Sequence, residues 1–435
     1  MQIDIKDLAN LCKKIINEPE KNIKKIKPLL NIKTEEVDDI SLVYLSVLKV
    51  FKNIIPLYKI RTLKDKIKFK KDDLEINKDD KNILKMYSFF INKICSDTSL
   101  ISYSVAIEIM EYFEHFNYID IIVKKILKGT TKTPNISKLC MDSLKKKICD
   151  DVNGDLVFCI VNQMYETSFH PDVLSFLLDI NLLKEFLEEE VVKKKDDFFK
   201  IKRSFKKENR RLEKSRRKLE TERRTEEQKE EKQDGFVIHR RIVDGLQRLY
   251  FLILRNKIKQ KFKYTFIGVR KYKKYIRKEF YEGLYILLND SINISNYEEK
   301  LYCILTIIDI YESYKYDFKR LVQALYNILY AFNPILSTSK LLLIEQVIDH
   351  LFINMKQPLK RVHLILERLI ILGCIRYNGL IKRIISRLGS PYDVDFNERF
   401  KYNETEYFEG EIEDKDIDQM EIKPLYCYTI FKKNL

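Results

Sequence analysis

The chain has 435 residues, of which 45% are hydrophobic and 34% charged, and its formal net charge is +16. This length allows about two or three domains of roughly 100–200 residues each, and the apolar fraction is ordinary for a globular protein. Ten glycines and nine prolines are too few for the many tight turns of an all-β sandwich or barrel. Neither a Walker A motif nor a dinucleotide fingerprint is present.

Apolar residues recur at spacings of three and four along the first part of the chain, which predicts a series of amphipathic helices. The helix expected over residues 42–55 is apolar on nearly all sides and should be central, with Ser41 as its cap and Pro56 at its end. The charged residues 64–81 predict a surface loop or a frayed helix. The other helices expected here cover residues 5–16, a short helix that begins at Pro19, and residues 83–95, 100–116, 119–127, 137–149, 154–167 and 171–187.

A long charged helix is expected next, because residues 187–233 contain no glycine or proline and are rich in good helix formers. Between Lys193 and Lys218 there are 14 Lys or Arg against four acids. Nine of the 21 arginines of the chain fall between Arg203 and Arg241. Because a guanidinium group matches phosphate oxygens in a bidentate manner, this clustering favours contact with an RNA backbone. The alternative is a solvated structural helix with pairs four residues apart.

A second helical array is expected after this helix, and Gly389-Ser390-Pro391 closes it. Residues 404–421 then carry nine acids against one lysine, which predicts a tail that is mobile until it docks. The tail either solubilises the chain, neutralises the basic helix when RNA is absent, or binds basic proteins. The helices expected in this array cover residues 237–256, 266–289, 297–314, 318–332, 340–354, 359–372 and 378–388.

These patterns together predict an all-α fold of two HEAT- or armadillo-like arrays, an α-solenoid, joined by a long charged helix. The expected domains are an N-terminal helical domain over residues 1–95, further helical repeats over 96–190, the basic helix over 191–235, a C-terminal helical-repeat domain over 236–391 and the acidic tail over 392–435.

Catalytic and cofactor chemistry is not indicated. The eight cysteines are scattered without a Cys-x-x-Cys pair, which favours reduced thiols in the nucleus or cytosol. The five histidines never lie four residues apart, and no nucleophile elbow is present. We therefore expect no enzyme, no metal or cofactor, no small-molecule substrate and no membrane segment.

Three stretches resemble the nucleolar complex-associated protein 3 family. The opening residues 8–23 resemble the start of the family's N-terminal domain, and residues 50–61, Val-Phe-Lys-Asn-Ile-Ile-Pro-Leu-Tyr-Lys-Ile-Arg, resemble its most distinctive string. Residues 203–232, followed by 246–255, are similar to a charged helix that runs into a Tyr-Phe-Arg-Ile-Leu-Lys segment. Residues 280–284 and 301–304 match the helix spacing of the family's CCAAT-binding-factor-like C-terminal domain.

The resemblance implies a non-catalytic assembly factor for the large (60S) ribosomal subunit in the nucleus and nucleolus. Its implied partners are a helical protein like nucleolar complex protein 2, pre-60S particles, pre-rRNA and ribosomal proteins. Two alternatives stay open: a chromatin-associated factor for DNA replication, and an adaptor solenoid that contacts proteins only.

The residues that would carry these contacts fall in two places. The string after residue 50 either packs within the fold or presents an exposed Tyr/Arg pair to a partner. The candidates for partner binding are Phe51, Ile54, Ile55, Tyr58 and Arg61, and the candidates for RNA binding are Lys202, Arg203, Lys206, Lys207, Arg210, Arg211, Lys214, Arg216, Arg217 and Lys218.

Overall fold

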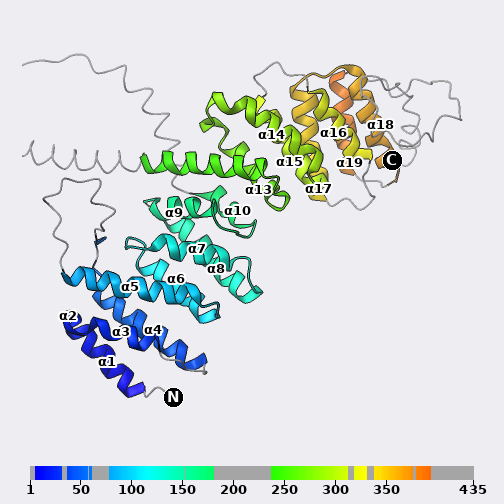
Figure 1. The fold of residues 1–435 in the computed structure, drawn as a ribbon. Helices are drawn as coiled ribbons and strands as arrows, with labels where there is room; N and C mark the ends of the chain where they lie inside the picture. The colour runs from blue at the N-terminus through cyan, green and yellow to red at the C-terminus, as the bar shows by residue number, and fades with distance from the viewer. Residues whose placement is uncertain are drawn as a thin grey trace, which may run out of the picture. The chain divides into compact units, whose positions relative to one another are not determined.

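The computed structural model shows an all-α protein, as the sequence predicts: within the described residues every regular element is a helix. The chain divides into two compact units, Met1–Leu249 and Tyr250–Leu435 (Figure 1). The finer domain boundaries expected from the sequence stay predictions. The structure describes residues 5–31, 37–56, 58–60, 78–151, 153–180, 237–311, 318–330, 338–375 and 379–392.

The first unit stacks its helices in two layers (Figure 1). In one layer α1 contacts α4, α4 contacts α6 and α6 contacts α8, whereas in the other α3 contacts α5, α5 contacts α7 and α7 contacts α9. This alternation is the arrangement of an α-solenoid. The helices are α1 (Ile5–Asn17), α2 (Pro19–Asn22), α3 (Ile26–Leu30), α4 (Val37–Ile54), α5 (Lys78–Ser96), α6 (Leu100–Tyr112), α7 (Ile119–Gly129), α8 (Pro134–Asp150), α9 (Asp155–Met164) and α10 (Val173–Phe176), with 3-10 turns at Ile23–Lys25 and Leu177–Asp179. Residues 237–249 add a helical segment to this unit.

The second unit repeats the principle: α13 contacts α15, α15 contacts α17 and α17 contacts α19, while α16 and α18 pack together beside them. After helical residues 250–255, its elements are α13 (Phe262–Lys271), α14 (Tyr281–Ile294), α15 (Tyr297–Tyr311), α16 (Lys319–Tyr330), α17 (Thr338–Ile348), α18 (Leu359–Ile375) and α19 (Gly379–Gly389). A π-helical turn covers Asp349–Asn354, and 3-10 turns cover Lys259–Lys261, Lys273–Tyr275, Lys278–Phe280 and Ser390–Tyr392.

Aromatic packing explains why α6 is shorter than the expected helix over residues 100–116. The helix ends at Tyr112, and Phe113 and Phe116 then pack edge-on against Tyr87 of α5 with ring centroids 6.1 and 5.1 Å away. All three rings are buried. The helix therefore ends where burying the rings of Phe113 and Phe116 in the core stabilises the fold more than another helical turn would.

Charge repulsion accounts for a second difference. The single helix expected over residues 266–289 is wrong, because α13 ends at Lys271 and α14 begins at Tyr281, with two 3-10 turns between them. In a continuous helix Arg270 and Lys274 would lie one turn apart, as would Lys273 and Arg277. Such like-charge pairs destabilise a helix, and apolar periodicity does not report them.

Two other helices also differ from the expected bounds. Helix α4 begins at Val37, so Ser41 lies inside it and is not its cap. Asp39 in the first turn suits the positive end of the helix dipole. Of the helix expected over residues 171–187, the described part is the short α10 with its 3-10 turn, and residues 181–187 lie outside the described residues.

Across the described parts of the chain, no helix is both long and apolar enough to cross a bilayer.

Candidate binding surfaces

The string predicted to bind a partner begins inside the core of the first unit. Phe51 is fully buried at the end of α4, and its ring lies 5.3 Å from Tyr87 and 5.4 Å from Phe90, measured between centroids. Ile54 and Ile55 are half-buried. Phe51 therefore contributes to the fold, and partner binding at this string depends on the residues that follow it.

Residues 58–60 are held in place by a side chain from elsewhere in the first unit. The Asn117 side chain accepts from the Ile60 backbone N–H at 3.1 Å and donates to the Ile60 carbonyl at 2.9 Å, and this amide is buried. A ring nitrogen of His115 lies 3.4 Å from the Pro56 carbonyl oxygen. The Asn117 side chain therefore supplies both hydrogen bonds that hold Ile60 against the turn between α6 and α7.

Tyr58 is the exposed member of the string, with 57% of its surface open to solvent. Its hydroxyl lies 3.3 Å from Oδ2 of Asp80 on α5, and the Asp80 charge raises the pKa of Tyr58. An aromatic ring held in one place and open to solvent is a suitable anchor for a partner. Arg61, the last residue of the predicted pair, lies outside the described residues.

The predicted RNA-binding residues, Lys202 to Lys218, also lie outside the described residues. They stay candidates on the strength of their sequence alone.

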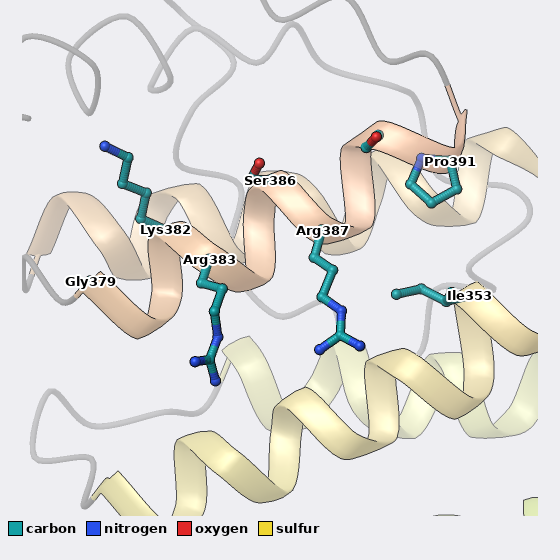
Figure 2. A pocket seen from close by; sticks show the side chains of 8 residues that line it. Ile353, Gly379, Lys382, Arg383, Ser386, Arg387 and Pro391 are labelled. Atoms are coloured by element: carbon teal, nitrogen blue, oxygen red, sulfur yellow. The ribbon is translucent and has the colours of Figure 1, made fainter.

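A pocket of about 670 Å³ lies along α19 in the second unit. Figure 2 shows Arg383 and Arg387 directed toward α17 and its π-helical extension, whereas Lys382 points away. Arg383 holds the Glu345 carboxylate with two hydrogen bonds, of 2.9 Å from Nε to Oε1 and 2.5 Å from Nη2 to Oε2. The pocket is lined by Ile353, Gly379, Lys382, Arg383, Ser386, Arg387, Ser390 and Pro391.

The charges around this pocket are nearly balanced. Arg387 pairs with Glu345 at 3.4 Å and with Asp349 at 3.1 Å, and the side chain of Glu345 is only 9% exposed. Burial raises the pKa of Asp349, and the neighbouring Glu345 raises it further, against the opposing effect of Arg387. Both arginines are thus paired with acids, and this cluster fastens α19 to α17 and its π-helical extension. Lys382 points away from the cluster.

Three cysteines of the described residues are kept protonated by burial. Burial raises the pKa of Cys140 and of Cys159 to about 12, and it raises the pKa of Cys303 well above its ordinary value, which makes these three thiols poor nucleophiles. Among the described residues, no group of three or more His, Cys, Asp or Glu side chains is placed to hold a metal ion.

A second basic segment, which does not stand out as a run of charge, begins beside the predicted basic helix. Residues 245–278 contain twelve Lys or Arg and no Asp or Glu, although the whole chain has 81 bases and 65 acids. The signal that identifies it is the absence of acids, since its bases are spread among apolar and aromatic residues.

Comparison with known proteins agrees with the sequence resemblance. A family model described as nucleolar complex-associated protein matches residues 4–90. The resemblance to the nucleolar complex-associated protein 3 family is confirmed. The nucleolar complex protein 3 homolog of Xenopus laevis is 26% identical over 348 residues, and that of Homo sapiens 24% over 352; each match covers 70% of this chain and 44% of the relative. Nucleolar complex-associated protein 3 of Arabidopsis thaliana is 25% identical over 191 residues, 40% of this chain and 23% of the relative.

Two facts follow from these matches. The chain spans less than half the length of the relatives it matches. The relatives are named as nucleolar proteins, which confirms the expected localisation in the nucleus and nucleolus.

Proposed function

We propose that this protein is a non-catalytic assembly factor for the large ribosomal subunit, a helical scaffold that holds a helical nucleolar partner and the backbone of pre-rRNA. The observation that carries the proposal is the similarity to nucleolar complex proteins, which covers 70% of the chain. A two-layer solenoid suits such a role, because stacked helix pairs offer extended surfaces to a partner.

The partner is proposed to be a helical protein like nucleolar complex protein 2, with pre-60S particles and ribosomal proteins as the wider assembly. Tyr58 is the proposed anchor in the first unit. Purification of the native protein and identification of its main stoichiometric companion tests the partner. Tyr58→Ala should weaken that association, whereas Tyr112→Ala, at a position that is also 57% exposed, serves as the matched control and should not.

The RNA contact is proposed for the basic helix through Arg210, Arg211, Arg216 and Arg217. Reversal of these four charges to Glu should reduce RNA association and its salt dependence. A control with the same change of charge reverses Lys145, Arg320, Lys356 and Lys382, all of which are exposed.

Sedimentation with pre-ribosomes separates the alternatives. Release by ribonuclease supports the proposal, whereas release by deoxyribonuclease would favour a role on chromatin. Unchanged nucleic-acid association and salt dependence in the arginine variant would mean that the basic helix is not the RNA clamp. An adaptor that contacts proteins only would be released by neither nuclease.

A further inference from the structure

Residues 250–278 of the acid-free segment form part of the surface of the second unit, and only some of their cations form contacts that hold the fold together. Lys263 pairs with Glu298 at 2.8 Å, and Arg270 pairs with Asp309. The Lys273 ammonium donates to the Asp309 carbonyl at 3.0 Å. The first two interactions fasten α13 to α15, and the third fastens the 3-10 turn after α13 to the same helix.

Five cations are left exposed and have no acidic partner within the described residues. Three lie where the chain turns into α13 and two lie after its end. Because α13 has ten residues, the helix is about 15 Å long, which exceeds the span of a single small anion and suits an extended polyanion. The five are Arg255, Lys257, Lys259, Lys274 and Arg277.

An aromatic contact brings the two groups to one side of the unit. Phe280 packs against Phe251 with ring centroids 6.0 Å apart. Arg255 lies one helical turn beyond Phe251 and therefore shares its face, and the Phe280 backbone N–H donates to the Arg277 carbonyl at 3.0 Å. The segment with Lys274 and Arg277 thus returns to the helical turn that carries Arg255, and Phe280, 47% exposed, links the two through its contacts with Phe251 and Arg277.

The backbone at Lys257 is a second, independent observation. Lys257 has a φ of 55°, in the left-handed region where glycine is favoured. Its N–H donates to the Leu254 carbonyl and the Ile258 N–H donates to the Ile253 carbonyl, both at 3.1 Å, which is a Schellman ending. A lysine at the glycine position of this motif is strained, and such strain is concentrated at functional sites.

We propose that this surface, defined by Arg255, Lys257, Lys259, Lys274, Arg277 and Phe280 and called here the α13 surface, binds single-stranded RNA. The cations contact successive phosphates and the Phe280 ring stacks on a base. An exposed aromatic ring between cations favours RNA over an acidic peptide, which has no base to stack. The inference rests on the proposed RNA-binding function and assigns it a site outside the basic helix.

The main test reverses Lys257, Lys259, Lys274 and Arg277 to Glu in the full chain and measures binding of a labelled, unstructured RNA oligonucleotide at several salt concentrations. The matched control is the quadruple charge reversal at Lys145, Arg320, Lys356 and Lys382. We expect roughly tenfold or greater loss of affinity in the test variant, with the salt slope reduced by roughly 0.7 for each phosphate that the protein no longer neutralises. Equal affinities of the test and control variants would overturn the inference.

Two single substitutions separate binding from folding. Lys257→Gly removes a charge and relieves the backbone, so it should weaken RNA binding while the melting temperature stays constant or rises. Phe280→Leu should weaken binding of the RNA but leave retention on heparin unchanged, because heparin offers charge without bases. If Phe280→Leu lowers both equally, or if the charge-reversal variant loses a poly-glutamate ligand and keeps RNA, the surface does not bind RNA.

Failure of this inference is distinguishable from failure of the proposed function. If the wild-type chain and the control variant bind RNA and the test variant equals them, only the α13 surface is wrong. If the wild-type chain does not bind RNA, the proposed RNA-binding function fails and the α13 surface fails with it. A duplex DNA probe in parallel shows which nucleic acid is preferred, and stronger retention of DNA would overturn the assignment to RNA.

Discussion

Two lysine-rich regions of this chain use their charge in opposite ways. In the first unit, lysines of α7 and α8 pair with glutamates: Lys124 with Glu166 at 3.1 Å, Lys146 with Glu111 at 3.1 Å and Lys147 with Glu114 at 2.9 Å. In the second unit, residues 250–278 have no acid of their own, and five exposed cations of this stretch, Arg255, Lys257, Lys259, Lys274 and Arg277, have no acidic partner among the described residues. Charge content alone therefore does not identify a binding surface, whereas the local supply of acids does.

The first way to break this comparison is to disturb the packing that shapes the acid-free segment. Gly268 of α13 faces the buried ring of Tyr250, and an added Cβ would lie 2.9 Å from Tyr250 Cε2 and still closer to Cζ and the hydroxyl oxygen. Gly268→Ala should therefore destabilise the protein by about 2–3 kcal/mol, measured as the free energy of unfolding in urea.

Gly283 supplies the control for this prediction. It lies in α14 with nothing within 4 Å of an added Cβ, so Gly283→Ala should be neutral or stabilise the protein by about 0.5–1 kcal/mol. If Gly268→Ala costs no more stability than Gly283→Ala, helix α13 tolerates displacement from Tyr250, and the packing argument is wrong.

A second test compares one acid that pairs with a cation of each region. Asp309 is only 10% exposed in its side chain and pairs with Arg270, so Asp309→Asn should cost about 1–2 kcal/mol because a partly buried guanidinium loses its partner. Glu111→Gln in the first unit removes a pair with Lys146, which is 64% exposed, and should change stability by less than about 0.5 kcal/mol. Unfolding in urea measures both, and a larger loss at Glu111 would reverse the comparison.

The helical class and the core of the string at Phe51 follow from periodicity in the sequence, because buried faces recur at the helical spacing. The break between α13 and α14 does not follow from it, since Val269, Tyr272 and Ile276 continue the apolar spacing through residues that leave the helix. The position of Ile60 could not be predicted from the sequence either, because it depends on a hydrogen bond with Asn117, which lies 57 residues further along the chain. Two observations identify the α13 surface. The absence of acids can be seen in the sequence, whereas the contact of Phe251 with Phe280 can be seen only in the fold.

The smallest expected effect concerns pH. Burial lowers the pKa of Lys261 to about 8, below its ordinary value. Below pH 8 this amine is protonated in both the folded and the unfolded chain, and the penalty of burying its charge is fully present. As pH rises above 8 the folded chain releases the proton first, while the unfolded chain keeps it until about pH 10.4, so the contribution of this group to stability rises with pH.

Lys261→Gln removes this titration. The free energy of unfolding of the variant relative to wild type should be most favourable below pH 8 and should decline toward pH 10. Lys259→Gln, at an exposed position two residues earlier, is the control. The same trend in both variants would contradict burial as its cause. RNA bound at the α13 surface adds negative charge near Lys261, which favours its protonated form. Saturating RNA should therefore move the decline to higher pH, and this links the buried amine to the open cationic surface around it.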